Sequence, residues 1–144
     1  MLVVDGISVA YGAVHALSKV SIEIGVNEFV SIIGPNGAGK TTLLKAICNV
    51  VPWYAGDIRV DGRSIRGCAP WDIARMGIAH VPEGRRVFGQ MTVEENLKVG
   101  AMTRTVDKSR LDGVYELFPQ LRALRLRRAV TMSGGEQQDR KSVV

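Results

Sequence analysis

The first part of the chain alternates apolar and polar residues with a period of two. Residues 2–9 alternate loosely up to a turn near Tyr11, and residues 20–24 alternate with polar neighbours until Gly25. This period is typical of strands that bury one face. The pattern therefore predicts two strands joined by a turn, in an antiparallel arrangement.

The pattern changes at residues 29–33, which read Phe-Val-Ser-Ile-Ile and lead directly into Gly34. A run this apolar is typical of a parallel strand buried on both faces, so we expect one here. After a glycine-rich stretch, Leu43, Ile47 and Val50 recur at helical spacing until Pro52 ends the pattern. The sequence therefore predicts a strand, a glycine loop and a helix in succession.

Shorter elements follow this unit. The pattern predicts a strand at residues 57–60 closed by a turn at Asp61, a helix at residues 70–76 and a strand at residues 78–81. Thr92 and Glu95 have the spacing of a helix capping box.

Beyond the capping box the pattern is helical, with apolar residues at positions 111, 114, 115 and 118. We therefore expect one domain over residues 1–144. It would consist of a mixed α/β lobe at about 1–90, a helical part at about 91–138 and an atypical tail at 139–144.

Composition narrows the class of protein. The 144 residues are 46% hydrophobic, suit one compact domain and contain no apolar run of the roughly 20 residues that a membrane-spanning helix needs. Two cysteines without metal-ligand spacing predict reduced thiols and a cytosolic protein. The net charge of +5 lies in residues 73–144, where arginines alternate with leucine rather than with stacking aromatics. We therefore expect no nucleic-acid partner.

The glycine-rich stretch matches the phosphate-loop pattern G-x-x-x-x-G-K-[ST]. Glycines let the backbone curl around phosphate oxygens, the lysine supplies a cation for the β- and γ-phosphates, and Thr41 offers a hydroxyl to Mg²⁺. A nucleoside triphosphate with Mg²⁺ is the expected ligand. The expected binding residues are Gly34, Pro35, Asn36, Gly37, Ala38, Gly39, Lys40, Thr41 and Thr42.

A second motif comes late in the chain, where Ser133, Gly134, Gly135 and Glu136 are followed by two glutamines. Serine and glutamate at this spacing form a capping box, and the glycines leave the first amides of a helix open to an anion. Together with the phosphate loop, this motif resembles the signature motif of ABC-type ATPases, with Met132 in place of the usual leucine. The resemblance covers the chain up to about residue 138 and implies a P-loop NTPase fold of the ABC ATPase type, with N-terminal antiparallel strands and a helical subdomain.

The resemblance assigns further residues. Tyr11 matches the aromatic residue that stacks on adenine, and Glu83 lies where most of the family has the glutamine of the Q-loop. Residues 82–86, Pro-Glu-Gly-Arg-Arg, are similar to ATP-binding subunits of bacterial branched-chain amino-acid importers. The resemblance therefore implies a transport-coupled ATPase that uses ATP and Mg²⁺.

In this family two such domains pair head to tail, so Ser133, Gly134, Gly135 and Glu136 would contact in trans the ATP held by the partner subunit. Closing the pair moves transmembrane permease subunits. The resemblance thus implies a cytoplasmic protein, peripheral on the inner face of the bacterial plasma membrane, that does not itself bind the solute.

The family's Walker B aspartate, its catalytic glutamate and its switch histidine are not found. The only apolar stretch after the phosphate loop that ends on aspartate, residues 58–61, fits a hairpin rather than a buried metal-binding strand. We therefore expect a domain that is incomplete at its C-terminus and hydrolyses ATP poorly on its own. The alternatives are a non-hydrolysing domain that only binds nucleotide or a partner subunit, and an ABC ATPase outside transport.

Overall fold

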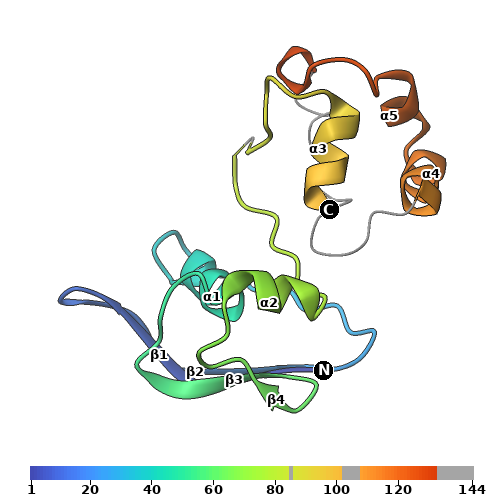
Figure 1. Cartoon of the computed structure of the whole chain (residues 1–144). Coiled ribbons are helices and arrows are strands. Elements are labelled where there is room, and N and C mark those ends of the chain that lie inside the picture. The colour runs from blue at the N-terminus through green and yellow to red at the C-terminus, as the bar shows by residue number, and fades with distance from the viewer. Residues whose placement is uncertain (85, 102–107, 133–144) are drawn as a thin grey trace. The chain divides into compact units, whose positions relative to one another are not determined.

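The computed structural model describes residues 1–84, 86–101 and 108–132. The chain divides into two compact units, Met1–His80 and Val81–Val144, and each is described by itself (Figure 1). No helix of the described residues is both long enough and apolar enough to cross a membrane.

The first unit contains a sheet of four antiparallel strands in the order β2-β1-β3-β4. The strands are β1 (Leu2–Tyr11), β2 (Val14–Ile24), β3 (Ala55–Val60) and β4 (Arg63–Ser64). The expected N-terminal antiparallel pair is confirmed, with Val4 opposite Ile22 and Tyr11 opposite Val14. The turn at Asp61 joins β3 to β4, so the stretch considered as a metal-binding strand is indeed part of a hairpin.

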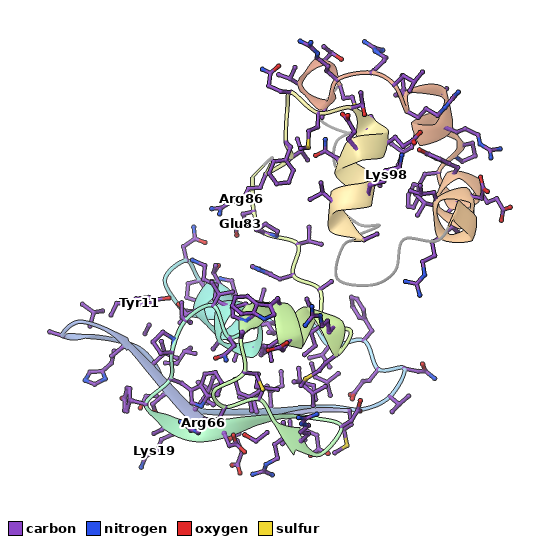
Figure 2. The ribbon with its side chains drawn as sticks, viewed as in Figure 1. Tyr11, Lys19, Arg66, Glu83, Arg86 and Lys98 are labelled. Carbon is purple, nitrogen blue, oxygen red and sulfur yellow. The ribbon has the colours of Figure 1, made fainter. Side chains whose placement is uncertain are left out.

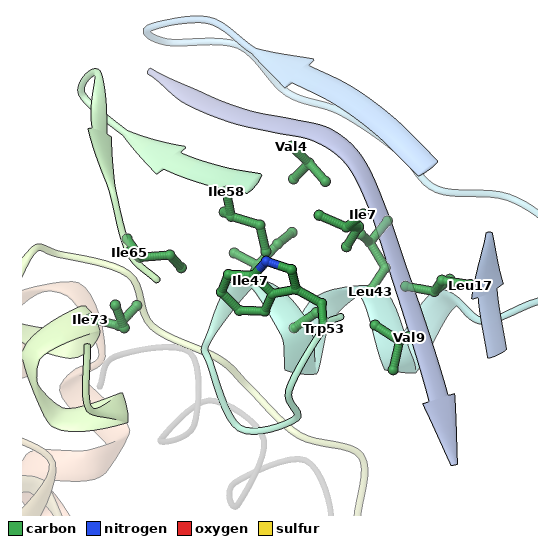
Figure 3. Packing of buried hydrophobic residues seen from close by; sticks show 11 residues of the cluster. Val4, Ile7, Val9, Leu17, Leu43, Ile47, Trp53, Ile58, Ile65 and Ile73 are labelled. Atoms are coloured by element: carbon green, nitrogen blue, oxygen red, sulfur yellow. The ribbon is translucent and has the colours of Figure 1, made fainter. Parts of the chain in front are cut away.

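Two helices cover one face of this sheet, α1 (Lys40–Ile47) and α2 (Pro70–Arg75) (Figure 1). Both were expected from the apolar spacing and from the proline at the first turn of α2. Figure 3 shows apolar side chains of β1 and α1 packed around Trp53. The buried cluster of the first unit comprises Val4, Ile7, Val9, Leu17, Leu43, Ala46, Ile47, Trp53, Ile58, Ile65 and Ile73.

The predictions of strands at residues 29–33 and 78–81 are wrong, because both stretches are irregular. Phe29 is 94% exposed and Ile33 is 91% exposed, whereas a parallel strand would bury both. A strand of this kind needs a hydrogen-bonded neighbour and an apolar layer on each face. Among the described residues, no strand pairs with either stretch, so their apolar content alone does not produce a strand.

The second unit is helical over the part that the structure describes. Its elements are α3 (Val93–Gly100), α4 (Lys108–Leu117), α5 (Pro119–Ala123) and a short 3₁₀ helix, η1 (Ala129–Thr131). Val93, Leu97, Tyr115, Leu121 and Met132 form its buried cluster. The helical character expected beyond Thr92 is therefore present, with its own apolar core.

The expected capping box begins α3. The Thr92 hydroxyl accepts a hydrogen bond from the Glu95 amide at 3.2 Å, and the Glu95 carboxylate accepts one from the Thr92 amide at 2.7 Å. The bond from the Thr92 amide, and next a bond of 2.9 Å that the Thr92 hydroxyl donates to the same carboxylate, lower the pKa of Glu95 below its usual value. Two amides that the helix itself leaves unpaired are satisfied in this way.

Replacing Thr92 by alanine should destabilise the start of α3 by about 1 kcal/mol, the typical value of an N-cap side chain. Amide hydrogen exchange of α3, followed by NMR, should speed up about fivefold. Thr92→Ser keeps the hydroxyl and should exchange like the unaltered chain. Equal exchange in the alanine and serine variants would contradict a stabilising cap.

The same capping box makes the stability of α3 depend on pH. Because the folded pKa of Glu95 lies below its unfolded value, the stabilisation is present above the unfolded pKa and is lost as pH falls through the folded one. Lowering the pH should therefore increase the amide hydrogen exchange of α3 less in Thr92→Ala than in the unaltered chain, because the Glu95 pKa is closer to its usual value in the variant.

Candidate functional site

The glycine-rich loop leads from the exposed stretch at residues 29–33 into the first turn of α1. Its residues up to Ala38 are exposed, and Ala38 donates a backbone hydrogen bond to the Pro35 carbonyl at 3.2 Å. Gly37 and Gly39 have φ angles of 85° and 87°, in the left-handed region that favours glycine. The motif thus forms an open turn on the surface of the first unit.

Gly39 is the N-cap of α1 and lies against the β1–β2 hairpin. A Cβ atom at Gly39 would lie 2.6 Å from Leu17 Cδ2 and 2.7 Å from the Ala16 carbonyl oxygen. Real Cβ contacts are never this short, so only glycine fits here with its present neighbours. Strand β2 therefore supports the loop at the residue where the helix begins.

The N-terminus of α1 has the properties of an anion site. No side chain caps it, and no acidic residue lies in its first turn. The first amides of the helix therefore point outward without an intrahelical acceptor, and the helix dipole adds positive potential. Together with the open loop, this geometry suits a phosphate group.

Lys40 bridges the loop in this structure. Its ammonium donates hydrogen bonds to the carbonyl oxygens of Gly34 and Pro35, both at 2.7 Å. An ammonium has three donors, so one N–H is left for a phosphate oxygen even while these two bonds persist. The lysine thus closes the first half of the loop and brings a positive charge to it.

Tyr11 ends β1 and is 48% exposed (Figure 2). In the register of the hairpin, Val9 lies opposite Leu17, the residue that touches Gly39, and Tyr11 lies two residues further along. Two residues of strand span about 7 Å. The hairpin therefore brings this exposed ring and the phosphate loop into the same neighbourhood.

Thr41 lies exposed in the first turn of α1, beside the loop. Its hydroxyl is a hard oxygen donor of the kind that Mg²⁺ accepts, and Mg²⁺ in phosphate sites is held mainly by water and by the phosphates themselves. Among the described residues, no group of three or more His, Cys, Asp or Glu side chains could hold a metal ion. The Thr41 hydroxyl thus fits as one oxygen ligand of a metal that arrives with a nucleotide.

The other candidate residues belong to the second unit. Glu83 is exposed in the irregular segment near the start of that unit (Figure 2). Ser133, Gly134, Gly135 and Glu136 lie outside the described residues. The structure therefore places Tyr11 and residues 34–42 on one unit and assigns no geometry to the signature motif.

Sequence reasoning missed two kinds of contact that hold the loop in place. Ala16 and Leu17 support Gly39 from β2, and the backbone carbonyls of Gly34 and Pro35 hold Lys40. Leu17 is also part of the apolar core. Its apolar side chain indicates burial, but it does not indicate contact with the glycine loop.

A glycine loop followed by a helix with a free N-terminus, on a lobe with an antiparallel sheet, defines a nucleotide-binding domain of the P-loop class. The chain belongs to the ABC transporter family, whose model matches residues 17–142.

Among individual proteins, the chain is 47% identical over 140 residues to the high-affinity branched-chain amino acid transport ATP-binding protein BraG of Pseudomonas aeruginosa. It is 39% identical over 134 residues to the probable branched-chain amino acid transport ATP-binding protein LivF of Archaeoglobus fulgidus. These alignments cover 96% and 92% of this chain but 60% and 57% of the two relatives. The chain thus spans somewhat less than two thirds of the length of these relatives.

Solved structures agree on the fold. An ATP-binding subunit of an ABC transporter superposes on 99% of this chain with a TM-score of 0.86 and 26% sequence identity, and 60% of that subunit is covered. A dimeric ATP-binding cassette bound to ADP and phosphate superposes with a TM-score of 0.85 at 20% identity, with 68% of it covered. The expected ABC ATPase fold is confirmed.

Gly39→Ala should destabilise the first unit more than Gly37→Ala. Both variants place a side chain at positive φ, but only the added methyl at Gly39 meets β2, whereas the space around Gly37 is open. Crowding of this kind costs about 1 to 3 kcal/mol beyond the shared backbone strain. Urea unfolding followed by tryptophan fluorescence, which comes from the buried Trp53 and the exposed Trp71 of the same unit, measures the difference. Equal unfolding midpoints for the two variants would show that β2 does not support the loop.

Proposed function

We propose that this chain is the ATP-binding part of an ABC importer for branched-chain amino acids and couples ATP binding and hydrolysis to transport. The observation that carries the nucleotide site is the open loop at the uncapped start of α1, supported by β2 through Gly39. The transport assignment is supported by the names of BraG and LivF, which are branched-chain amino acid transport ATP-binding proteins.

In this proposal the loop amides and the Lys40 ammonium bind the β- and γ-phosphates of ATP. Tyr11 stacks on the adenine ring, which is a use for an exposed aromatic ring at the end of a strand. Thr41 supplies one oxygen ligand to Mg²⁺, which neutralises phosphate charge when bound. Pro35, Asn36, Ala38 and Thr42 complete the cradle.

The proposal includes a second ATP-binding subunit, paired head to tail. Ser133, Gly134, Gly135 and Glu136 would then contact the nucleotide of the partner, where a helix start and a hydroxyl favour negative charge. The dimeric state of the cassette bound to ADP and phosphate supports this arrangement. Glu83 would occupy the Q-loop position of the family.

Transmembrane permease subunits are the other proposed partners and would hold the chain at the inner face of the membrane. An apolar patch on the second unit, formed by Phe88, Met91 and Val130, supports a protein contact, since all three side chains are exposed. Its two segments lie side by side, because the Ala129 amide donates to the Met91 carbonyl at 2.9 Å and the Val130 amide to the Gly89 carbonyl at 3.0 Å. Exposed apolar groups gathered in this way are typical of interaction surfaces.

Nucleotide binding is tested with Lys40→Ala and a matched control on the same helix, Lys45→Ala. Losing the ammonium should weaken binding of MgATP at least about tenfold, because a hydrogen bond to a charged group contributes about 1.5 to 3 kcal/mol. Lys45, in the last turn of α1, should be replaceable without loss. Titration calorimetry gives both affinities, and similar affinities for the two variants would overturn the phosphate assignment.

The adenine assignment is tested separately in the same measurement. Tyr11→Ala should weaken ATP binding about tenfold through lost stacking, whereas Tyr11→Phe keeps the ring and should retain most of the affinity. Inorganic triphosphate lacks a base, so its binding should not change in either variant. A Tyr11→Ala variant that binds ATP normally would rule out the stacking role.

The importer assignment is tested by co-purification with branched-chain amino-acid permease subunits expressed together with the chain. Phe88→Ser in the apolar patch should reduce recovery of the permease about fivefold, because a large buried side chain contributes more than 1 kcal/mol at an interface. Val14→Ser changes another exposed apolar residue, on the first unit, and should have no effect. Absence of co-purification with the unaltered chain would contradict the importer assignment without affecting nucleotide binding.

A further inference from the structure

The segment that links α5 to η1 is a turn rich in arginine. Residues 124–128 read Leu-Arg-Leu-Arg-Arg, and Figure 1 shows this segment running from α5 back to the start of α3. The Arg127 amide donates to the Leu124 carbonyl at 2.8 Å, so Arg125 and Leu126 occupy the middle of a β-turn. We call residues 124–128 the arginine turn. Neither the nucleotide site nor the apolar patch includes it.

The backbone of the arginine turn is bonded to the first turn of α3. The carbonyl oxygens of Arg127 and Arg125 accept hydrogen bonds from the amides of Val93 and Glu94, both at 3.0 Å. These amides are among those that a helix leaves without an intrahelical acceptor, so the turn completes the start of α3. A ligand that binds the arginine turn therefore does not have to order its backbone first.

Three arginines of the turn are available to a ligand. Arg125, Arg127 and Arg128 are all exposed. Over the part of the chain that the structure describes, none of the three forms an ion pair. The Arg125 guanidinium donates to the Arg122 carbonyl at 3.3 Å, which leaves most of its N–H groups for a ligand.

The acidic side chains close to Arg125 are already paired with other cations. Glu94 and Asp112 line one groove with Arg125. The Glu94 carboxylate lies 2.6 Å from the Lys98 ammonium, and the Asp112 carboxylate lies 3.0 Å from the Arg122 guanidinium. The arginine turn therefore keeps a net positive charge.

An apolar side chain lies in the middle of the same turn. Leu126 is 71% exposed, between Arg125 and Arg127 in the chain. A lipid bilayer has both kinds of partner at its surface, since headgroup phosphates attract guanidiniums and the boundary of the acyl chains accepts apolar groups. The combination of exposed arginines and an exposed leucine on a convex turn fits such a surface.

We propose that the arginine turn binds directly to a membrane surface that contains anionic phospholipid. The guanidiniums of Arg125, Arg127 and Arg128 donate hydrogen bonds to headgroup phosphates, and Leu126 inserts between the headgroups. The proposed function holds the chain at a membrane through permease subunits. This contact adds lipid binding that needs neither the permease nor nucleotide.

Two other kinds of anionic partner fit the turn less well. A protein interface of ordinary size involves about 20 to 30 residues a side, far more than this turn presents. Anionic lipid, in contrast, adds about fivefold in membrane partitioning for each arginine near the surface, so a short turn is enough. A nucleic acid would gain from aromatic rings on which bases stack, and residues 124–128 contain none.

The experiment is sedimentation of the full chain with vesicles of equal parts phosphatidylglycerol and phosphatidylcholine, in the presence of MgATP. The chain should bind these vesicles saturably and bind vesicles of phosphatidylcholine alone at least about tenfold more weakly. Raising NaCl from about 0.1 to about 1 M, which shortens the screening length from about 10 to about 3 Å, should release the chain. Equal binding to the two kinds of vesicle would overturn the proposal.

The role of the arginines is tested with two triple variants. Arg125→Gln, Arg127→Gln and Arg128→Gln together should weaken vesicle binding about 100-fold, because three arginine contributions are lost. Arg125→Lys, Arg127→Lys and Arg128→Lys together keep the charge and should bind within about fivefold of the unaltered chain. Both variants keep the backbone bonds to α3, so their thermal unfolding midpoints should match that of the unaltered chain.

A third triple variant controls for the net charge of the protein. Lys19→Gln, Arg63→Gln and Arg75→Gln together remove the same charge from exposed positions on the first unit and should leave vesicle binding unchanged. Leu126→Ser should weaken vesicle binding at least about fivefold, because the apolar insertion is lost. Inorganic phosphate at the concentration of the lipid phosphate should not displace the chain, which separates a membrane surface from a free anion.

Three further results would overturn the proposal. Equal losses in the glutamine variants of the two units would show an effect of overall charge. Unchanged binding in Leu126→Ser, or displacement by inorganic phosphate, would leave free phosphate groups as the ligand. A short single-stranded RNA that binds more tightly than the vesicles, and is lost with the same three glutamines, would assign the turn to nucleic acid. None of these results bears on nucleotide affinity or on recovery of the permease, which are measured separately.

Discussion

The close approach of Gly39 to β2 is the constraint on which the phosphate loop depends. Leu17 is a core residue of the first unit and also the side chain that a Cβ at Gly39 would strike. Because Gly39 is the N-cap of α1, its packing against the hairpin fixes the direction in which the free amides of the first turn point. The anion site is therefore a consequence of packing in the first unit and shares its stability.

Interactions between near neighbours in the chain were predictable. The capping box at Thr92, the helix after the glycine loop and the hairpin of β1 and β2 all arise from residues within a few positions of one another or across one turn. The strand expected at residues 29–33 depends instead on neighbours far along the chain. Apolar residues indicate a tendency to be buried but do not identify the partner, and among the described strands this stretch has none.

The candidate site also has one part that could be predicted from the sequence and one part that could not. The motif predicts residues 34–42 as the phosphate-binding loop, since phosphate chemistry requires those residue types at that spacing. It could not identify Ala16 and Leu17, which approach from another strand.

The two halves of the phosphate loop are held differently. Gly39 is held by the core through β2, whereas Gly34 follows an exposed stretch and is bonded to the Lys40 ammonium. A phosphate that attracts this ammonium acts on the same group that closes the first half of the loop. In the proposed function, bound nucleotide engages the ammonium that closes this half of the loop, and a ligand present at 100 times its dissociation constant stabilises the folded unit by about 2.7 kcal/mol.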